Sequence, residues 1–470
     1  MNGLGLHRAL CDALGAAAVK TEPEDLAVYA FDAYSEDRLP DAAVLPNDAA
    51  GVAAVVRIAR DFEVPIVARG AGTGLCGGAV PVAGGIVVSF ARMNRILSID
   101  AANRRARVQP GVANLELSHA AAAHGLFFGP DPSSQKTSTL GGNAATNAGG
   151  AHAFAYGSMN AHVLGLEFVD ATGEIVRTSI HDAGYDLTGV LVGSEGTLGI
   201  VTALELRLLR IPSAVRVCVA AFGDVESASE CVSAIVAAAI PATALEIMDR
   251  TIVRAVEAHY RAGYPQDAGA VLLVEVAGNE IDVAAHERDV AGFARSHGAL
   301  AWHSAASERE REALWAARKG AAGALGRIAP NYYIQDATVP RTRLPQAIRR
   351  VEEIARDHDL PVGNVFHAGD GNLHPLLIFD RREKRQLDAV VAAGHDILVA
   401  CIELGGTISG EHGIGYEKRE TLPLVFSPDD LATMLRLRDA LGAARLFNPG
   451  KIFPLGTACV EVRQPVPTLA

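Results

Sequence analysis

Three glycine-rich segments in the first half of this chain constrain its fold more than any other feature. They are ARGAGTGLCGGAVP, GPDPSSQKTSTLGGNAATNAGGAHAFAYG and GYDLTGVLVGSEGTLGIV. The second is a long run of small side chains, which make poor core material, and such a loop is entropically costly to order without a partner. We therefore expect a long ligand to lie along this part of the chain, contacted by backbone more than by side chains.

The first segment satisfies the pattern G-x-G-x-x-G with Gly72, Gly74 and Gly77. A Rossmann dinucleotide site requires a helix to begin at the third glycine. Here Pro81 follows and the chain runs into the expected strand IVVSF, which excludes the Rossmann interpretation. The backbone N–H groups could still form an anion-binding nest beside Arg69, and the alternative is a glycine-rich turn without a ligand.

Composition and charge exclude several classes of function. The 470 residues carry 42 basic and 54 acidic side chains, a net charge of −12, with no basic run for a nucleic acid. The six cysteines lie far apart, without iron–sulfur spacing, and we expect reduced thiols in the cytoplasm. No signal peptide or membrane-spanning run of eighteen or so apolar residues is evident, so we expect any association with the inner membrane to be peripheral.

The order of expected helices, strands and glycine-rich loops along the chain predicts an α+β fold in two domains. Residues 1–37 have helical spacing, and residues 38–213 combine a helix capped by Asp48 with short strands and glycine-rich loops. Residues 214–456 open with a strand, a helix and further strands in the alternation of a ferredoxin-like sheet. The last residues, 457–470, form a tail that we expect to be loosely held.

The segment VFHAGDGNLHPLLIF places two histidines, His367 and His374, around the turn Asp370-Gly371-Asn372. We expect NVF and PLLIF to pair as a hairpin with the two imidazoles across from each other on one face. Convergent imidazoles suit a divalent metal. Two structural histidines are the alternative.

A second candidate element is SGEHGIG, with Glu411 and His412 in a loop of small residues. Glu411 could complete a His, His, Glu site with open positions, as catalytic zinc requires, and His412 could remain free as a base near neutral pH. We expect zinc, although manganese or iron would also suit these ligands. A surface loop with an exposed Glu-His pair is the alternative.

The glycine-rich segments resemble the FAD-binding domain of the vanillyl-alcohol-oxidase type, also called the p-cresol methylhydroxylase (PCMH) superfamily. The likeness lies in PIVARGAGTGLCGGAVP, PDPSSQKTSTLGGNAATNAGG and VGSEGTLGIVT. It implies a PCMH-type domain of two subdomains that binds FAD, and the FAD is expected to be non-covalent because the first loop lacks a histidine. By resemblance the pyrophosphate is lined by Arg69, Gly70, Ala71, Gly72, Thr73 and Gly74, the flavin and its linker by Pro130, Asp131, Thr139, Asn143 and Asn147, and the adenine end by Glu195, Gly196 and Ile200.

The second half resembles the FAD-linked oxidase C-terminal domain, found in the FAD subunit of bacterial glycolate oxidase, in D-lactate dehydrogenases and in D-2-hydroxyglutarate dehydrogenases. The shared pieces are LWAARKG, FHAGDGNLHP, SGEHGIG and FNPGKIFP. The resemblance implies a substrate domain with a C-terminal helical return to the flavin. By resemblance, a metal is held by His367, His374 and Glu411, the hydroxyl proton is taken by His412, the substrate carboxylate pairs with Arg318, and the flavin is approached by Asn448.

The chemistry of a 2-hydroxy acid needs these roles. Oxidation removes the hydroxyl proton and a hydride while the carboxylate is held still. A metal lowers the hydroxyl pKa, His412 accepts the proton, and Arg318 can offer two parallel N–H bonds. A solvated or ion-paired surface arginine is the alternative for Arg318.

The segment NYYIQDATVPRTRLP resembles the glycolate-oxidase branch. It offers no lysine around Ile334 and Gln335 for a second carboxylate, so we expect glycolate, or D-lactate, in preference to D-2-hydroxyglutarate. The resemblance implies an iron–sulfur subunit and a second FAD-domain subunit as partners. A quinone or a cytochrome is the expected eventual acceptor, and an enzyme that works without partner subunits is equally compatible.

Two other classes of function compete with this interpretation. One is a non-catalytic flavoprotein subunit, which would not need to gather these histidines. The other is a nicotinamide dehydrogenase, for which the sequence offers no site.

Overall fold

A computed structural model describes residues 3–34 and 37–455, so the expected tail 457–470 lies outside the described residues. The chain forms two compact units. The first comprises the described parts of Met1–Gly149, Ser158–Ile211 and Glu411–Ala470, and the second comprises Gly150–Gly157 and Pro212–Gly410. The units therefore meet in sequence close to the expected boundary at 213, but each also takes in a segment from the other half of the chain.

The helices of the first unit are α1 (Gly3–Leu14), α2 (Pro23–Leu26), α3 (Ala49–Asp61), α4 (Asn114–Ala122), α5 (Leu140–Thr146), α7 (Leu187–Leu191) and α15 (Pro428–Ala440). Its strands are β1 (Val19–Lys20), β2 (Ala42–Val44), β3 (Ile66–Arg69), β4 (Ile86–Ser89), β5 (Ile96–Asp100), β6 (Arg105–Val108), β7 (Leu126–Phe127), β8 (Val163–Val169), β9 (Ile175–Ser179), β10 (Ile200–Arg207) and β11 (Leu209–Arg210).

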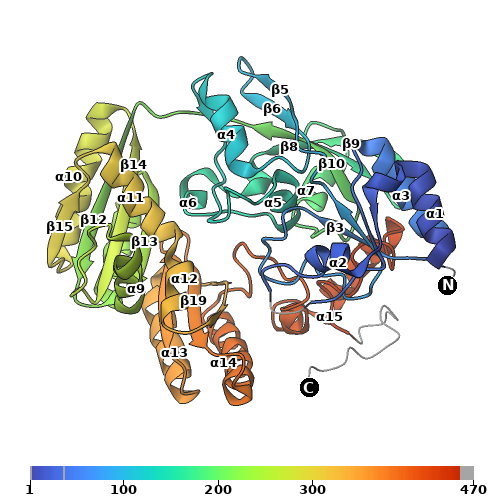
Figure 1. Cartoon of the computed structure of the whole chain (residues 1–470). Helices are drawn as coiled ribbons and strands as arrows, with labels where there is room; N and C mark the ends of the chain where they lie inside the picture. Colours follow the sequence, from blue (N-terminus) through green and yellow to red (C-terminus); the bar gives the residue numbers. More distant parts are fainter. Residues whose placement is uncertain (1–2, 35–36, 456–470) are drawn as a thin grey trace. The chain divides into compact units, whose positions relative to one another are not determined.

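The first unit contains a four-stranded sheet in the order β1-β2-β4-β3, with β2, β4 and β3 parallel. Helices α1 and α3 contribute apolar side chains to its core, and Figure 1 shows both beside this sheet. The expected cap of α3 is confirmed, because the Asp48 side chain accepts from the Gly51 amide at 2.9 Å. The expectation of helix throughout residues 1–37 is wrong at Val19–Lys20, which instead pair with Val44 and Ala43 as β1.

A second, five-stranded antiparallel sheet of the first unit has the order β5-β6-β10-β8-β9. Helices α4, α5 and α7 contribute to its apolar core. Two sheets with separate cores correspond to the expected two subdomains, and the α+β class is confirmed.

The helices of the second unit are α6 (Ala153–Tyr156), α8 (Val225–Ala237), α9 (Arg250–Tyr260), α10 (Glu280–Ser296), α11 (Glu308–Lys319), α12 (Ala321–Ala324), α13 (Leu344–Asp357) and α14 (Lys384–Glu403). Its strands are β12 (Ala214–Phe222), β13 (Ala242–Asp249), β14 (Ala270–Gly278), β15 (Ala301–Ser304), β16 (Asn331–Ile334), β17 (Ala337–Thr338), β18 (Val362–His367) and β19 (Asn372–Phe379).

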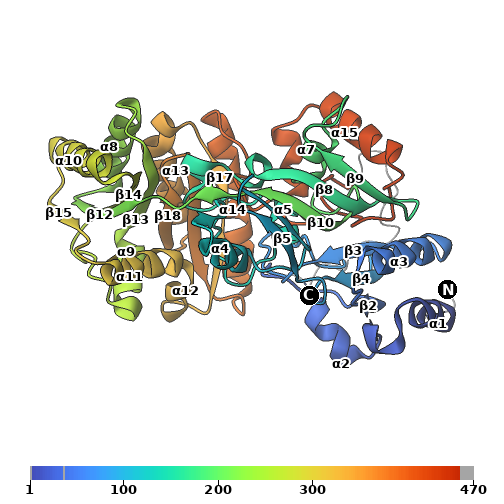
Figure 2. The ribbon, with the colours of Figure 1, turned by 90° about the horizontal axis from the view of Figure 1, so that it is seen from above.

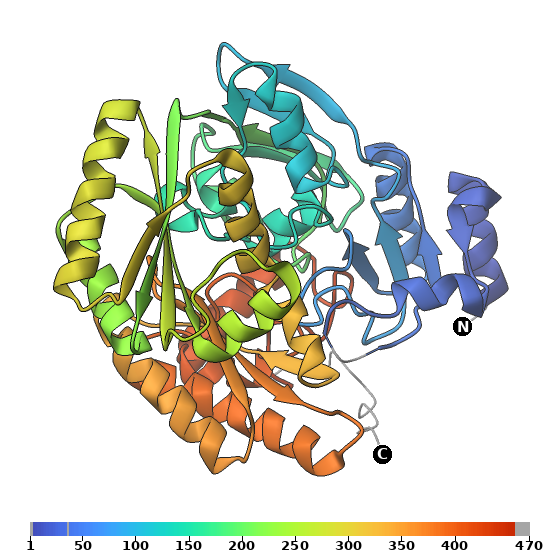
Figure 3. The same ribbon diagram turned by 60° about the vertical axis from the view of Figure 1, so that its left-hand side comes forward.

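The second unit is built on one antiparallel sheet in the order β15-β12-β14-β13-β18-β19-β16, with β17 also paired to β19. Its first four strands, with α8 and α10 as the connecting helices, have the order 4-1-3-2 of a ferredoxin-like motif, which confirms the expectation. Figure 2 shows α8 and α10 on one side of these strands and α9, α11 and α12 on the other. Figure 3 shows α10, in yellow, running along these strands.

The segment Gly150–Gly157 belongs to the second unit although it is the end of the second glycine-rich segment. His152 anchors it, because its Nε2 lies 2.9 Å from the carboxylate of Glu275 on β14. Thr243 and Trp315 also donate to Glu275, at 2.9 and 2.8 Å. Burial alone would raise the pKa of Glu275, but these hydrogen bonds lower it.

Candidate active site

The expected histidine hairpin is present as β18 and β19. His367 pairs with Asn372 and His374 pairs with Val365, so the imidazoles lie on one face as diagonal neighbours and not directly across from each other. Their ring centroids are 5.0 Å apart, at 88°. Gly371 has a φ of +82°, a conformation that costs glycine little. The turn therefore brings the two imidazoles together as the sequence predicted.

The neighbouring strand β13 supplies a carboxylate behind His367. Glu246 is opposite His367 in the register, and its two oxygens lie 2.8 and 3.0 Å from Nδ1 of the imidazole. Both side chains are buried. A proton on Nδ1 would place the lone pair of His367 on Nε2, the form that binds metals in many carboxylate–histidine–metal arrangements.

Sequence reasoning missed Glu246, although a signal was present. It lies in the middle of the fully buried strand ATALEIMD, whose other acidic residue, Asp249, is at the end. A charge inside an apolar strand is costly unless it is paired.

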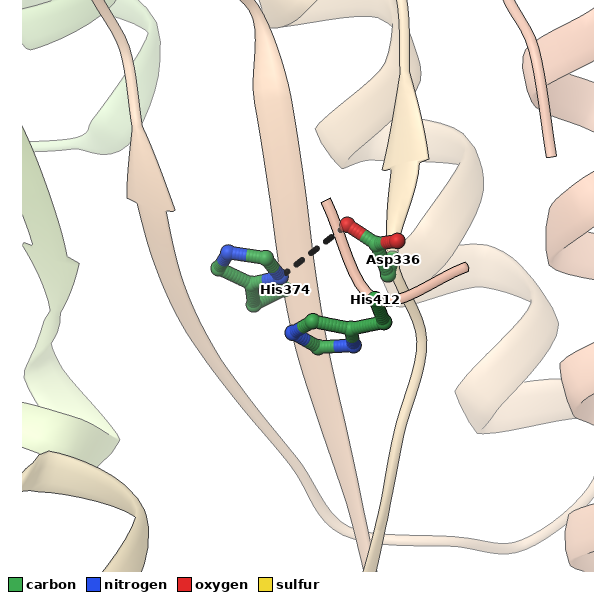
Figure 4. A group of neighbouring side chains, drawn as sticks. All are labelled: Asp336, His374 and His412. Carbon is green, nitrogen blue, oxygen red and sulfur yellow. Dashed lines mark ion pairs between the residues drawn. The ribbon is translucent and has the colours of Figure 1, made fainter. Parts of the chain in front are cut away.

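Asp336 is the carboxylate next to His374 and was also missed, although it lies too far from the imidazole for a hydrogen bond. Its carboxylate lies 3.9 Å from Nδ1 of His374, as the dashed line in Figure 4 marks. Asp336 is fully buried and also accepts from the Ser409 hydroxyl at 2.7 Å and from the Gly410 amide at 3.0 Å. It therefore fixes the chain immediately before Glu411.

The three expected metal ligands, His367, His374 and Glu411, which we call the metal triad, are brought together: each offers one candidate ligand atom, and these atoms all lie within 4.8 Å of one another. Asp336, His374 and His412 form a second such group, drawn in Figure 4. The two groups share His374, and in the second group Asp336 also accepts from Ser409 and Gly410 through its Oδ2. Two buried imidazoles with a carboxylate behind each, and a third carboxylate beside them, fit a divalent metal.

Arg318 is buried on α11, with 5% of its surface exposed, which excludes the alternative of a solvated surface residue. Its Nη2 forms an ion pair with Glu246, the same carboxylate that contacts His367. Its Nε makes no hydrogen bond within residues 3–34 and 37–455. The structure therefore ties Arg318 to the metal triad through one shared carboxylate.

The first glycine-rich segment presents a row of open backbone donors. Among the described residues, none of the amides of residues 70–74 donates a hydrogen bond to a protein acceptor. These residues are partly or fully exposed, so an anion can reach the amides. Consecutive unpaired N–H groups form a nest that suits a pyrophosphate, and the segment thus fits FAD.

Arg69 lies next to this nest and is held by two backbone carbonyls. Its guanidinium donates to the carbonyls of Phe31 at 2.5 Å and Val28 at 3.1 Å, and burial lowers its pKa. A Cβ on Gly72, whose φ is +71°, would lie 2.3 Å from Nη2 of Arg69. These contacts hold the loop, and a direct bond from Arg69 to the pyrophosphate stays a prediction.

The second glycine-rich segment meets the first at Gly70, where an added Cβ would lie 2.3 Å from the hydroxyl oxygen of Thr139. Thr139 caps α5, and the amide of Asn143 donates to the buried Asn114 at 3.0 Å. Asn114 in turn donates to the carbonyl of Pro130 at 2.9 Å. Buried Asp131 and the left-handed Asn147 complete the expected flavin-side set.

Glu195 and Asn448 join the third segment to the C-terminal part of the first unit. The Glu195 carboxylate accepts from the amides of Ile414 at 2.7 Å and Gly415 at 2.8 Å. The Asn448 amide donates to the carbonyls of Gly78 and Glu195, at 2.9 and 2.8 Å. These polar groups hold the loops together, so any contact of Glu195 or Asn448 with the cofactor stays a prediction.

Two further expected adenine-side residues differ in what they can offer. Gly196 has a φ of +70°, which brings backbone close to a neighbour without a side chain. Ile200 is 1% exposed and packs in the core of the first unit, so only its backbone could meet a ligand.

Lys451 is a buried cation beside these loops that sequence reasoning did not single out. It donates to the carbonyl of Val80 at 2.6 Å and to Asn448 at 3.2 Å. Burial lowers its pKa to about 7. Its place in FNPGKIFP gave no signal of burial, because lysines are rarely buried unless they are paired.

Comparison with known families gives two matches that together span most of the chain. Residues 211–452 match the family described as FAD linked oxidases, C-terminal domain, and residues 40–179 match an FAD binding domain.

Three curated relatives align along nearly the whole chain. The glycolate oxidase subunit GlcD of Escherichia coli K12 is 42% identical, covering 93% of this chain and 89% of that protein. GlcD of Bacillus subtilis is 39% identical, with 91% and 92% covered. A D-lactate dehydrogenase of Archaeoglobus fulgidus is 34% identical, with 87% and 90% covered.

A solved structure of 4-ethylphenol oxidase from Gulosibacter chungangensis shares the fold. It superposes with a TM-score of 0.80 at 17% identity, covering 96% of this chain and 97% of that one. In the part of the chain that the structure describes, no helix combines the length and apolar character needed to cross a membrane.

Proposed function

This chain belongs to the FAD linked oxidase family, and from that premise we propose that it is an FAD-dependent dehydrogenase that oxidises a small 2-hydroxy acid, glycolate first. The observation that carries the proposal is the metal triad, with its ligand atoms within 4.8 Å, beside a buried arginine and a histidine base. The curated glycolate oxidase and D-lactate dehydrogenase relatives support the same class of substrate.

The amide nest of residues 70–74 is proposed to hold the pyrophosphate of non-covalent FAD, with Gly70 seated on Thr139. When bound, FAD accepts a hydride from the carbon that bears the substrate hydroxyl. The chain contributes the loops that fix the cofactor, through Arg69, Glu195 and Asn448.

His367, His374 and Glu411 are proposed to hold a divalent metal, zinc in the first instance. When bound there, the metal lowers the pKa of the substrate hydroxyl. His412 accepts the hydroxyl proton, since an imidazole is a competent base near neutral pH. Arg318 holds the carboxylate of the acid, for which its Nε is available. The hydroxyl proton thus leaves to His412 and the C–H hydrogen leaves as hydride, which yields the 2-oxo acid.

Glycolate is preferred within the class because the segment around Ile334 and Gln335 offers no cation for a second carboxylate. Gln335 is 1% exposed, and an added Cβ on Gly394 of α14 would lie 2.7 Å from its amide nitrogen, so its side chain packs against that helix.

We further propose that an iron–sulfur subunit and a second FAD-domain subunit receive the electrons on the way to a quinone. The proposed compartment is the cytoplasm, peripheral to the inner membrane.

The test is an anaerobic titration of the purified protein with glycolate, D-lactate and D-2-hydroxyglutarate, followed by the loss of visible flavin absorbance. We expect glycolate to bleach the flavin most readily, chelation to abolish bleaching, and zinc to restore it. A yellow protein that none of the acids bleaches would contradict the substrate class. Preferential bleaching by D-lactate would replace glycolate as the substrate and keep the chemistry.

His412→Ala separates the enzyme from a non-catalytic flavoprotein subunit. We expect flavin content to be retained and flavin reduction by glycolate to slow by at least about 100-fold, the scale of a lost general base. The matched control is His395→Ala, since His395 lies on α14 with 56% of its side chain exposed. Equal rates in the two variants would remove His412 as the base. Reduction of added NAD by glycolate would favour a nicotinamide dehydrogenase, and we expect none.

A further inference from the structure

Glu246 stands between two groups to which the proposed reaction assigns different tasks. Its two carboxylate oxygens lie 2.8 and 3.0 Å from Nδ1 of His367, the proposed metal ligand. The same carboxylate forms an ion pair with Arg318, which is proposed to hold the substrate. Glu246 is 1% exposed, so bulk solvent does not reach this carboxylate. The two groups thus depend on a single buried anion.

Stability gives no sufficient reason to keep a charge in this place. Removing carboxylate and guanidinium from water costs several kcal/mol per ion by rough estimate, and apolar replacements of buried ion pairs are often neutral or stabilising. The adjacent strand β14 offers a comparison in Glu275, which is also buried but receives three hydrogen bonds from His152, Thr243 and Trp315. Glu275 anchors a segment, whereas the partners of Glu246 are both groups of the site.

We propose that Glu246 is a positioning residue that couples metal binding to recognition of the substrate carboxylate. It accepts from Nδ1–H of His367 and so presents the Nε2 lone pair to the metal. It holds Arg318 through Nη2, while Nε of Arg318 has no hydrogen-bond partner among the described residues. The inference rests on the proposed function and adds a residue that neither motif similarity nor the ligand set identifies.

The discriminating variant is Glu246→Gln, which keeps the shape but has a single carbonyl oxygen. That uncharged oxygen is drawn to the charged Arg318, at the position of Oε2, whereas the shorter contact of His367, at 2.8 Å, is with the other position, Oε1. The amide NH₂ then faces His367, which favours the tautomer with its proton on Nε2 and blocks metal binding. Zn²⁺ affinity, measured on the flavin-loaded protein by competition with a chromophoric chelator, is expected to fall 10- to 100-fold, the usual scale for a supporting carboxylate.

Glu275→Gln is the matched control, because it removes another buried carboxylate from the same sheet without touching the hairpin histidines. Its Zn²⁺ affinity should stay within about twofold of the wild type. If Glu246→Gln and Glu275→Gln bind Zn²⁺ equally well, Glu246 has only a structural role and the proposal is overturned.

The double variant Glu246→Gln with Arg318→Met provides the signature that a structural role would not give. Removing Arg318 frees the glutamine oxygen to accept from His367, so Zn²⁺ should bind more tightly than to Glu246→Gln alone. A further loss of affinity in the double variant would overturn the coupling.

Two more measurements keep the proposal open to refutation if Glu246→Gln fails to load with flavin. Arg318→Met alone should keep wild-type Zn²⁺ affinity, since His367 retains Glu246, but should raise KM for glycolate more than it lowers kcat. Glu246→Asp, which keeps the charge on a shorter arm, should lose Zn²⁺ affinity. Unchanged Zn²⁺ affinity in Glu246→Asp would contradict the positioning role.

The wild-type protein distinguishes this inference from the proposed function. If wild-type protein binds no Zn²⁺ and oxidises glycolate after chelation, the metal part of the proposed function fails before any variant is compared. If the wild type binds Zn²⁺ and needs it, only the variant results bear on Glu246.

Discussion

The cofactor segments of the first unit and the histidine hairpin of the second unit offer different groups for binding: backbone amides in the first and side chains in the second. Residues 70–74 present backbone amides, and the side chains around them hold loops in place. At the hairpin, side chains act directly, and buried carboxylates lie beside them. The comparison teaches that a glycine-rich site depends on the absence of side chains, whereas a metal site depends on exact chemical identity at a few positions.

The largest expected effect comes from removing a side chain at the hairpin. His374→Ala deletes one ligand of the triad, so Zn²⁺ affinity and glycolate-driven flavin reduction should each fall by at least about 100-fold, because loss of a supporting residue alone costs 10- to 100-fold. Flavin content should remain that of the wild type, since the cofactor segments belong to the first unit. Zinc content by elemental analysis and flavin absorbance after gel filtration measure the two. A parallel loss of flavin would break the comparison.

The converse change adds a side chain to the amide nest. Gly72→Ala requires alanine at a φ of +71° and places its Cβ 2.3 Å from Arg69, against a side chain that burial and two carbonyls hold in place. A left-handed alanine alone costs about 1 kcal/mol, and displacing Arg69 adds to it. We expect at least tenfold weaker FAD binding with an unchanged Zn²⁺ affinity, as measured by fluorescence titration of the apoprotein with FAD. Tight FAD binding by Gly72→Ala would contradict the role of the nest.

The sequence allowed the histidine hairpin to be predicted because its information is local. Asp370-Gly371-Asn372 specifies a turn, and the turn brings His367 and His374 to one face. The diagonal placement could not be predicted, since it depends on the register of the whole hairpin. Glycine density likewise predicted a backbone-lined site.

The supporting carboxylates could not be located from sequence because their partners are distant along the chain. Glu246 is 121 residues from His367, and only the order of strands in the sheet brings them together. Similarly, Glu195 lies in the third glycine-rich segment, but its carboxylate accepts hydrogen bonds from the amides of Ile414 and Gly415, which are distant in the sequence. Long-range pairing of this kind is a property of topology.

A smaller effect concerns how the hairpin sheet supports its charges. Asp249, at the end of β13, caps α9 and accepts from the Asn364 amide at 2.6 Å, and burial raises its pKa to about 6. The folded state therefore prefers the protonated form of Asp249. The free energy of unfolding is highest below pH 3.8, the ordinary pKa, and it falls as the pH rises through 6. Asp249→Asn should remove this decline, which is on the order of 1 to 3 kcal/mol. Denaturant unfolding at pH 4.5 and 7.5 measures it, and an undiminished decline in the variant would exclude Asp249 as its source.

The smallest effect tests whether glycine matters by position or by its mere presence. Gly292 lies inside α10, and an added Cβ there would meet nothing within 4 Å. Gly292→Ala should therefore stabilise the protein by about 0.5 to 1 kcal/mol, because alanine loses less backbone entropy in a helix. Flavin and Zn²⁺ binding should be unchanged. Gly72→Ala and Gly292→Ala make the same chemical change at two positions. If only Gly72→Ala weakens flavin binding, the effect of glycine comes from the left-handed loop conformation and the open amides around it. A comparable loss of flavin in both variants would instead mean that flavin retention follows global stability.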